Sequence, residues 1–95
     1  MIFMAEEIQR TLDTPCTALV LSYLVEMNSK KNLEEIENAI NERSKLIRYS
    51  KDSVFRSLQT LEYRGLVILD EENANITPSG KEFNNHLEAA AKWLK

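Results

Sequence analysis

The sequence predicts a small, mostly α-helical domain with one short β-hairpin. Apolar residues recur at helical spacing along most of the 95 residues, which include only two glycines and two prolines. One short run, Leu66 to Leu69, is typical of a strand. Asn75 to Thr77 is its expected partner, with Asp70 to Ala74 at the tip between them. A chain of this length supports one hydrophobic core, so residues 1–95 are expected to form a single domain.

The N-terminal part of the chain predicts two helices. Residues 5–12 form a short helix that ends before Asp13. The second helix has Thr14 as its cap and Pro15 in its first position, where the missing N–H of proline is no loss, and it runs to about Asn28. Because this second helix is apolar on most sides, it belongs in the middle of the domain.

A capping box predicts the start of the next helix. Asn32 and Glu35 have the spacing at which each side chain can bond to the backbone N–H of the other residue. The helix is expected to fray between Asn41 and Ser44. Its buried stripe consists of Leu33, Ile36 and Ile40.

The following helix is predicted over residues 50–64. Ser50 is its expected cap, and Gly65 supplies a left-handed stop after Arg64. At about 100° per residue, its aliphatic side chains form one narrow buried stripe of Val54, Leu58 and Leu61. The side chains expected to point outward are those of Ser53, Arg56, Gln59, Thr60 and Tyr63.

The last helix begins at Thr77-Pro78 and carries apolar residues spaced four, three and four, which is typical of a seam that packs on another helix. Phe83 and Leu87 are also well placed to cover the core of their own chain, whereas the later residues lie too far out to do so. A monomer would leave Trp93 in water. We therefore expect a homodimer, with an interface formed by Phe83, Leu87, Ala90, Trp93 and Leu94.

Two segments carry a resemblance to a known family. SVFRSLQTLEYRGLVIL reads as a recognition helix followed by a strand, and ITPSGKEF reads as a second strand followed by a helix start. With these segments in this order, the chain from Leu33 to Phe83 resembles the winged helix-turn-helix transcriptional regulators of the MarR and PadR type. The resemblance covers just over half of the sequence.

The resemblance implies a fold and a partner. The expected fold is a mostly α winged helix-turn-helix with a small two-stranded β-wing and a C-terminal dimerisation helix. Its winged-helix core spans residues 14–81, and flanking helices in 1–13 and 82–95 make dimer contacts. The expected function is sequence-specific binding of double-stranded DNA to regulate transcription, with the helix over residues 50–64 in the major groove.

The resemblance also implies roles for four side chains of that helix. Ser53 and Arg56 point at base edges, while Ser57 and Thr60 lie near phosphates. An α-helix fits the major groove, and a guanidinium can donate two parallel hydrogen bonds to a guanine edge, a contact worth about 1–3 kcal/mol of discrimination. Arg56 is therefore the residue most directly expected to read a base.

The distribution of charge favours the same surface. The whole chain carries a net charge of -3, but residues 43–64 hold six basic residues against two acidic ones. Among the basic residues, Lys45, Arg48 and Lys51 are expected to contact phosphates. Such contacts set affinity and salt dependence and carry no sequence information.

The wing departs from the family pattern. Its tip reads Asp70, Glu71, Glu72 and Asn73, with no basic residue, so it would repel phosphate. Either the wing stays away from the DNA or it faces a protein. The alternative function is therefore a protein-interaction module in a larger assembly, which uses the acidic wing or the helix over residues 50–64.

Other function classes find no support in the sequence. Two glycines cannot build a phosphate-binding loop and no nucleophile–base pair is present, so no enzyme is expected. Cys16 is predicted to be a small buried residue. Cys16, His86 and Glu88 do not indicate a metal cluster, and no cofactor is expected. The run Ala18 to Val25 is too short to span a bilayer and the start is not typical of a secretion signal, which predicts a cytoplasmic protein. No residue identifies a small-molecule effector.

Overall fold

The computed structural model describes residues 6, 10–11, 14–45 and 47–93. Glu6, Arg10 and Thr11 are helical, and the remaining residues of the helix predicted over 5–12 lie outside the described part. The other elements are, in order, α2 (Pro15–Met27), β1 (Lys31–Asn32), α3 (Leu33–Arg43), α4 (Lys51–Tyr63), β2 (Val67–Asp70), β3 (Asn73–Ile76) and α5 (Pro78–Trp93).

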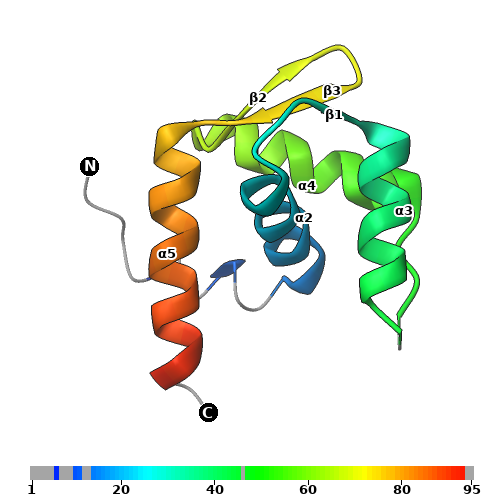
Figure 1. Ribbon diagram of the computed structural model, residues 1–95. Coiled ribbons are helices and arrows are strands. Elements are labelled where there is room, and N and C mark those ends of the chain that lie inside the picture. Colours follow the sequence, from blue (N-terminus) through cyan, green and yellow to red (C-terminus); the bar gives the residue numbers. More distant parts are fainter. Residues whose placement is uncertain (1–5, 7–9, 12–13, 46, 94–95) are drawn as a thin grey trace.

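Helix α2 lies at the centre of the molecule, as its apolar sequence predicts. It passes between α3 and α5, with α4 packed across it and the sheet lying over one of its ends (Figure 1). Val20, Leu21 and Leu24 are completely buried, and they join the apolar sides of the other elements in one hydrophobic core. The prediction of a buried central helix is confirmed.

The start of α2 differs from the prediction. Thr14 does occupy the cap position before Pro15, but its hydroxyl makes no bond to the first turn of α2. The Thr14 Oγ1 instead donates to the backbone carbonyl of Arg10 at 2.9 Å. Thr14 therefore ties α2 to the preceding residues and leaves the first turn of the helix without a side-chain cap.

The capping box of α3 is confirmed. The Glu35 N–H donates to Asn32 Oδ1 at 2.8 Å, and the Asn32 N–H donates to Glu35 Oε1 at 3.2 Å. The helix ends at Arg43, within the segment predicted to fray. Its buried side chains are those expected, Leu33, Ile36 and Ile40.

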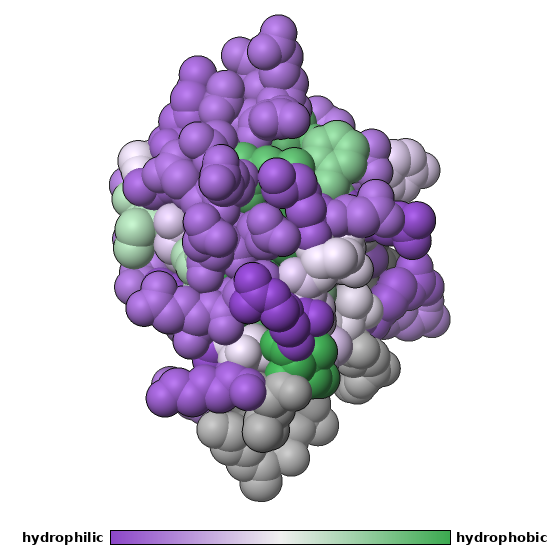
Figure 2. Space-filling model, turned by 90° about the vertical axis from the view of Figure 1, so that its right-hand side faces the viewer, coloured by the Kyte–Doolittle hydropathy of each residue, from purple (hydrophilic) through white to green (hydrophobic). Residues whose placement is uncertain are grey.

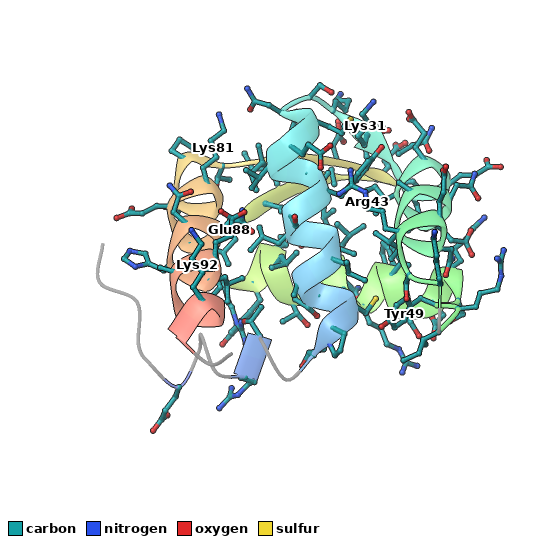
Figure 3. The ribbon with its side chains drawn as sticks, turned by 60° about the horizontal axis from the view of Figure 1, so that its bottom comes forward. Lys31, Arg43, Tyr49, Lys81, Glu88 and Lys92 are labelled. Atoms are coloured by element: carbon teal, nitrogen blue, oxygen red, sulfur yellow. The ribbon has the colours of Figure 1, made fainter. Side chains whose placement is uncertain are left out.

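Side chains of α3 fix the turn that leads to α4. Asn41 Nδ2 donates to the Tyr49 carbonyl at 2.9 Å, and the Tyr49 N–H donates to Asn41 Oδ1 at 2.6 Å. Arg43 reaches across to α2, where it forms an ion pair of 2.7 Å with Glu26 and lies over the ring of Tyr23 (Figure 3). The bonds of Asn41 therefore fix the turn between α3 and α4, and the contacts of Arg43 hold α3 against α2.

Helix α4 begins and ends as its sequence predicts, to within a residue. The Ser53 N–H donates to the Ser50 hydroxyl at 3.1 Å, and Gly65 has the left-handed conformation with φ 75°. The helix itself ends at Tyr63, and Arg64 is its C-cap.

The hairpin predicted as a two-stranded wing is present as β2 and β3, and the sheet has a third strand, β1, that the sequence did not predict. The strand order is β1-β3-β2 with antiparallel pairing, and the Leu33 N–H also donates to the Glu72 carbonyl at 2.8 Å. Strand β1 has only two residues, too few to show an alternating pattern in the sequence. The hairpin turns at Glu71 and Glu72, a shorter tip than predicted, and Glu71 has a positive φ of 57°.

The junction before α5 explains both glycines. Thr77 Oγ1 accepts from the Gly80 N–H at 3.0 Å and shares its hydrogen between the carbonyls of Gly65 at 2.8 Å and Leu66 at 2.9 Å, which caps α5 and ties its start to the turn that follows α4. A Cβ on Gly80 would lie 2.1 Å from the Leu66 carbonyl oxygen, whereas a Cβ on Gly65 would meet nothing within 4 Å. Gly80 is required by a close approach, and Gly65 by its backbone conformation.

No helix within the described ranges is both long and apolar enough to cross a membrane.

The two glycines predict two different stability losses. Gly80→Ala should lower the free energy of unfolding by about 2–3 kcal/mol, because the new methyl group overlaps backbone that cannot easily move. Gly65→Ala should cost about 1–2 kcal/mol from the left-handed conformation alone, and Gly65→Asn less. Urea denaturation of the three variants and the parent measures these differences. A Gly80→Ala variant as stable as the parent would show that α5 does not approach Leu66 this closely.

Candidate nucleic-acid interface

The outer face of α4 is open to solvent. The Arg56 side chain is 77% exposed and Tyr63 is 93% exposed, while the opposite side of the helix is buried in the core. The outward direction predicted for this face is confirmed for Ser53, Arg56, Gln59, Thr60 and Tyr63. This α4 outer face, defined by those five residues, is the candidate interface.

Arg56 has an intramolecular partner. Its Nη2 lies 3.1 Å from a carboxylate oxygen of Asp52, one turn earlier, and both side chains are more than two-thirds exposed. An exposed ion pair of this kind contributes at most about 0.5 kcal/mol. The guanidinium can therefore leave Asp52 at little cost when a better acceptor is presented.

Ser53 has a hydrogen that remains available to a ligand. The Ser50 hydroxyl accepts from the Ser53 N–H and donates to Ser53 Oγ at 3.1 Å. Because Ser53 Oγ is the acceptor in that second bond, its own hydrogen can point into solvent. A group bound over the first turn of α4 would meet a hydroxyl donor there.

The two residues predicted near phosphates behave differently. Thr60 is exposed, and its hydroxyl donates to the Arg56 carbonyl at 3.0 Å, so it must rotate before it can donate to a phosphate. Ser57 is only 5% exposed, and its hydroxyl accepts from the Thr17 hydroxyl at 3.1 Å. Ser57 therefore joins α4 to α2 and is not part of the exposed face, although it lines the groove between these two helices.

Three cations lie on the approach to α4. Lys45, Arg48 and Lys51 are all exposed, and none of them forms an ion pair with another described residue. Arg43, which also belongs to the basic segment, is occupied by Glu26 and Tyr23. The side of the molecule that carries α3 is largely hydrophilic, with small hydrophobic patches (Figure 2).

A groove runs beside the contact between the start of α2 and α4. It has a volume of about 380 Å³ and is lined by both elements, with Ser53, Arg56, Ser57 and Thr60 on the side of α4. Cys16 lies in its wall and is buried, which confirms the prediction that it is a small buried residue. Hollows along the second half of α4 are lined by Arg10 and Arg64, two arginines that the sequence did not assign to the site.

The hairpin tip is acidic and exposed. Asp70, Glu71 and Glu72 all face solvent, and the strands beside them hold the tip near the first turn of α3, where Glu34 and Glu35 add further negative charge. The tip therefore offers no cation to a phosphate.

The residues predicted at the dimer interface fall into three groups. Phe83 and Leu87 are buried in the core of their own chain, so that core, and not a second subunit, covers them. Ala90 is half-buried, and α5 continues past it to Trp93. The side chains of Trp93 and Leu94 lie outside the described residues.

Comparison of the sequence with models of known protein families gives no match, and comparison with curated proteins finds none of significant similarity. The resemblance to winged-helix regulators therefore rests on the residues and on the order of the elements.

Proposed function

We propose that this protein binds double-stranded DNA in a sequence-specific manner and regulates transcription, with α4 in the major groove. The observation that carries the proposal is the α4 outer face. It combines an exposed guanidinium with hydroxyl and amide side chains on a helix whose other side is fixed in the core. A helix of this kind fits the major groove and can place Arg56 and Ser53 against base edges.

The cations beside α4 support the same mode of binding. Lys45, Arg48 and Lys51 come just before α4 or in its first turn, where a helix seated in the groove is flanked by the phosphates of the two strands. These side chains would hold the helix in position, and Arg56 would discriminate between bases.

A homodimer is part of the proposal. Helix α5 extends beyond Leu87, the last of its described side chains to be buried, and the small residue Ala90 leaves room for a second helix to approach. A twofold dimer would present two α4 helices to successive major grooves, about 34 Å apart, and would recognise a palindromic site.

The acidic wing favours a second candidate function. The exposed carboxylates of Asp70, Glu71 and Glu72 have the charge of a surface that binds a basic protein. In that alternative, the chain is a winged-helix interaction module in a larger assembly, and α4 or the wing contacts a protein partner.

Arg56→Ala should reduce specificity more than it reduces general affinity. For a duplex selected from a random library, we expect affinity to fall about 5- to 150-fold, because two hydrogen bonds to a base edge are lost. For a scrambled duplex, the loss should be much smaller. Fluorescence anisotropy with both duplexes at one salt concentration measures the ratio.

Arg56→Lys is the matched variant for this measurement. It keeps the charge and loses the paired donors, so it should lose discrimination while it retains affinity for the scrambled duplex. If Arg56→Ala binds both duplexes with the ratio of the parent, Arg56 does not read a base.

Salt dependence separates the two candidate functions. If Lys45, Arg48 and Lys51 contact phosphates, the logarithm of the duplex binding constant should fall with the logarithm of salt concentration at a slope of about -0.9 for each contact. A titration of the parent chain between low and physiological salt gives this slope. A parent chain that binds duplex with almost no salt dependence, or does not bind it, would favour the protein-interaction module.

The dimer predicts a position-specific effect on α5. Ala90→Glu should convert a dimer into a monomer, because it puts charge and bulk into the proposed contact between helices. Asn85→Glu adds the same charge on an exposed part of α5 and should leave the dimer intact. Sedimentation equilibrium measures the mass, and circular dichroism checks that both variants fold. A monomeric parent chain would remove this part of the proposal.

A further inference from the structure

A cleft rich in arginine lies where the second half of α4 meets the residues before α2. Arg10, Thr60 and Arg64 line both of the hollows at this place, and we call these three residues the arginine cleft. Arg56 continues the lining on one side, and Thr14 and Thr17 continue it on the side of α2. No described residue that lines either hollow is acidic.

The fold holds one guanidinium of the cleft in place. Arg64 is half-buried at the C-terminal end of α4, and its Nη1 donates to the hydroxyl of Thr11 at 2.8 Å. A guanidinium has five N–H donors, so this bond leaves most of them for a ligand. Because the side chain is already anchored, binding a ligand would cost it little conformational entropy.

Arg10 brings a second positive charge to the same cleft. Its backbone carbonyl accepts from the Thr14 hydroxyl, which holds Arg10 next to the first turn of α2. Within the described ranges, neither Arg10 nor Arg64 forms an ion pair with a carboxylate. Two cations directed at one cleft repel each other, and an anion between them would relieve that repulsion.

The start of α2 adds to the positive potential. Its first turn has no side-chain cap and contains no acidic residue, and the cleft is lined by Thr14, just before the helix, and by Thr17. The N-terminal end of a helix favours a negative charge placed beside it. A tetrahedral anion of the size of a phosphate group would therefore meet guanidinium donors and the positive end of α2 together.

We propose that the arginine cleft binds a phosphate group, and that in the DNA complex proposed above this group is a backbone phosphate beside the C-terminal half of α4. The second part rests on the proposed function. It follows from continuity, because Arg56 and Thr60 belong both to the α4 outer face and to the lining of the hollow. The residues before α2 then form part of the nucleic-acid interface, although they lie outside the helix-turn-helix.

The test compares Arg10→Gln with Lys30→Gln. Both changes remove one exposed positive charge, but Lys30 lies beyond the far end of α2, about 20 Å from the cleft along 13 helical residues. Arg10→Gln should make the salt dependence of duplex binding shallower by about 0.9 in slope and weaken selected and scrambled duplexes equally. Lys30→Gln should leave the slope unchanged.

Free phosphate separates the sources of the ligand. Inorganic phosphate added to the parent chain without DNA should shift the amide NMR signals of Thr17 and Arg64, and Arg10→Gln should abolish these shifts. Arg64→Lys keeps the charge but has fewer N–H donors, so it should weaken the phosphate-induced shifts. A thermal melt checks that this variant still folds when the contact between Arg64 and Thr11 is altered.

The outcomes distinguish this inference from the proposed function. If the parent binds duplex, Arg10→Gln has the parental slope and phosphate shifts no signal, then the cleft is not a phosphate site, although DNA binding stands. If the parent binds no duplex but phosphate shifts are lost in Arg10→Gln, the cleft takes phosphate from a free ligand and the proposed function fails. If neither DNA nor phosphate binds, both proposals are wrong.

Discussion

The structure depends on the burial of α2. Val20, Leu21 and Leu24 are inaccessible to solvent, and the helix is apolar on so many sides that no single neighbour could cover it. The other elements must therefore surround it, and α3, α4, α5 and β3 all contact it. Each helix packed around α2 turns its apolar stripe inward. The polar side of α4 is left facing solvent for that reason, so the candidate interface is a consequence of how the core is filled.

The order of the elements and the direction of α4 could be predicted because both depend on local patterns. Helical periodicity, the Asn32–Glu35 capping box and the Gly65 stop all operate over a few residues. Contacts between distant parts of the chain left no such signal. Strand β1 exists because Lys31 lies opposite Ala74, and the bond between the hydroxyls of Thr17 and Ser57 joins residues that are 40 apart in the sequence. The same reason hid the arginine cleft, in which Arg64 meets Thr11.

The net charge of the chain is a poor guide to its surface. The total is -3, but the carboxylates of the hairpin tip and of the first turn of α3 gather near the sheet. The cations around α4 and before α2 lie elsewhere, and the sheet and the start of α2 are at opposite ends of that helix (Figure 1). A molecule with separated charges can orient itself in the field of a polyanion even when its overall charge is unfavourable. Separation of this kind also weakens binding at the wrong face, which favours one direction of approach.

The bond between the Leu33 N–H and the Glu72 carbonyl restricts the movement of the hairpin. A hairpin attached only at its base could swing without disturbing the rest of the molecule. Here the tip is also fixed to the first residue of α3, through this bond and the pairing of β1 with β3. Any displacement of the tip must either break these bonds or carry the beginning of α3 with it. The hairpin therefore cannot move independently of α3. A partner that displaces its tip also displaces the helix that precedes the turn into α4.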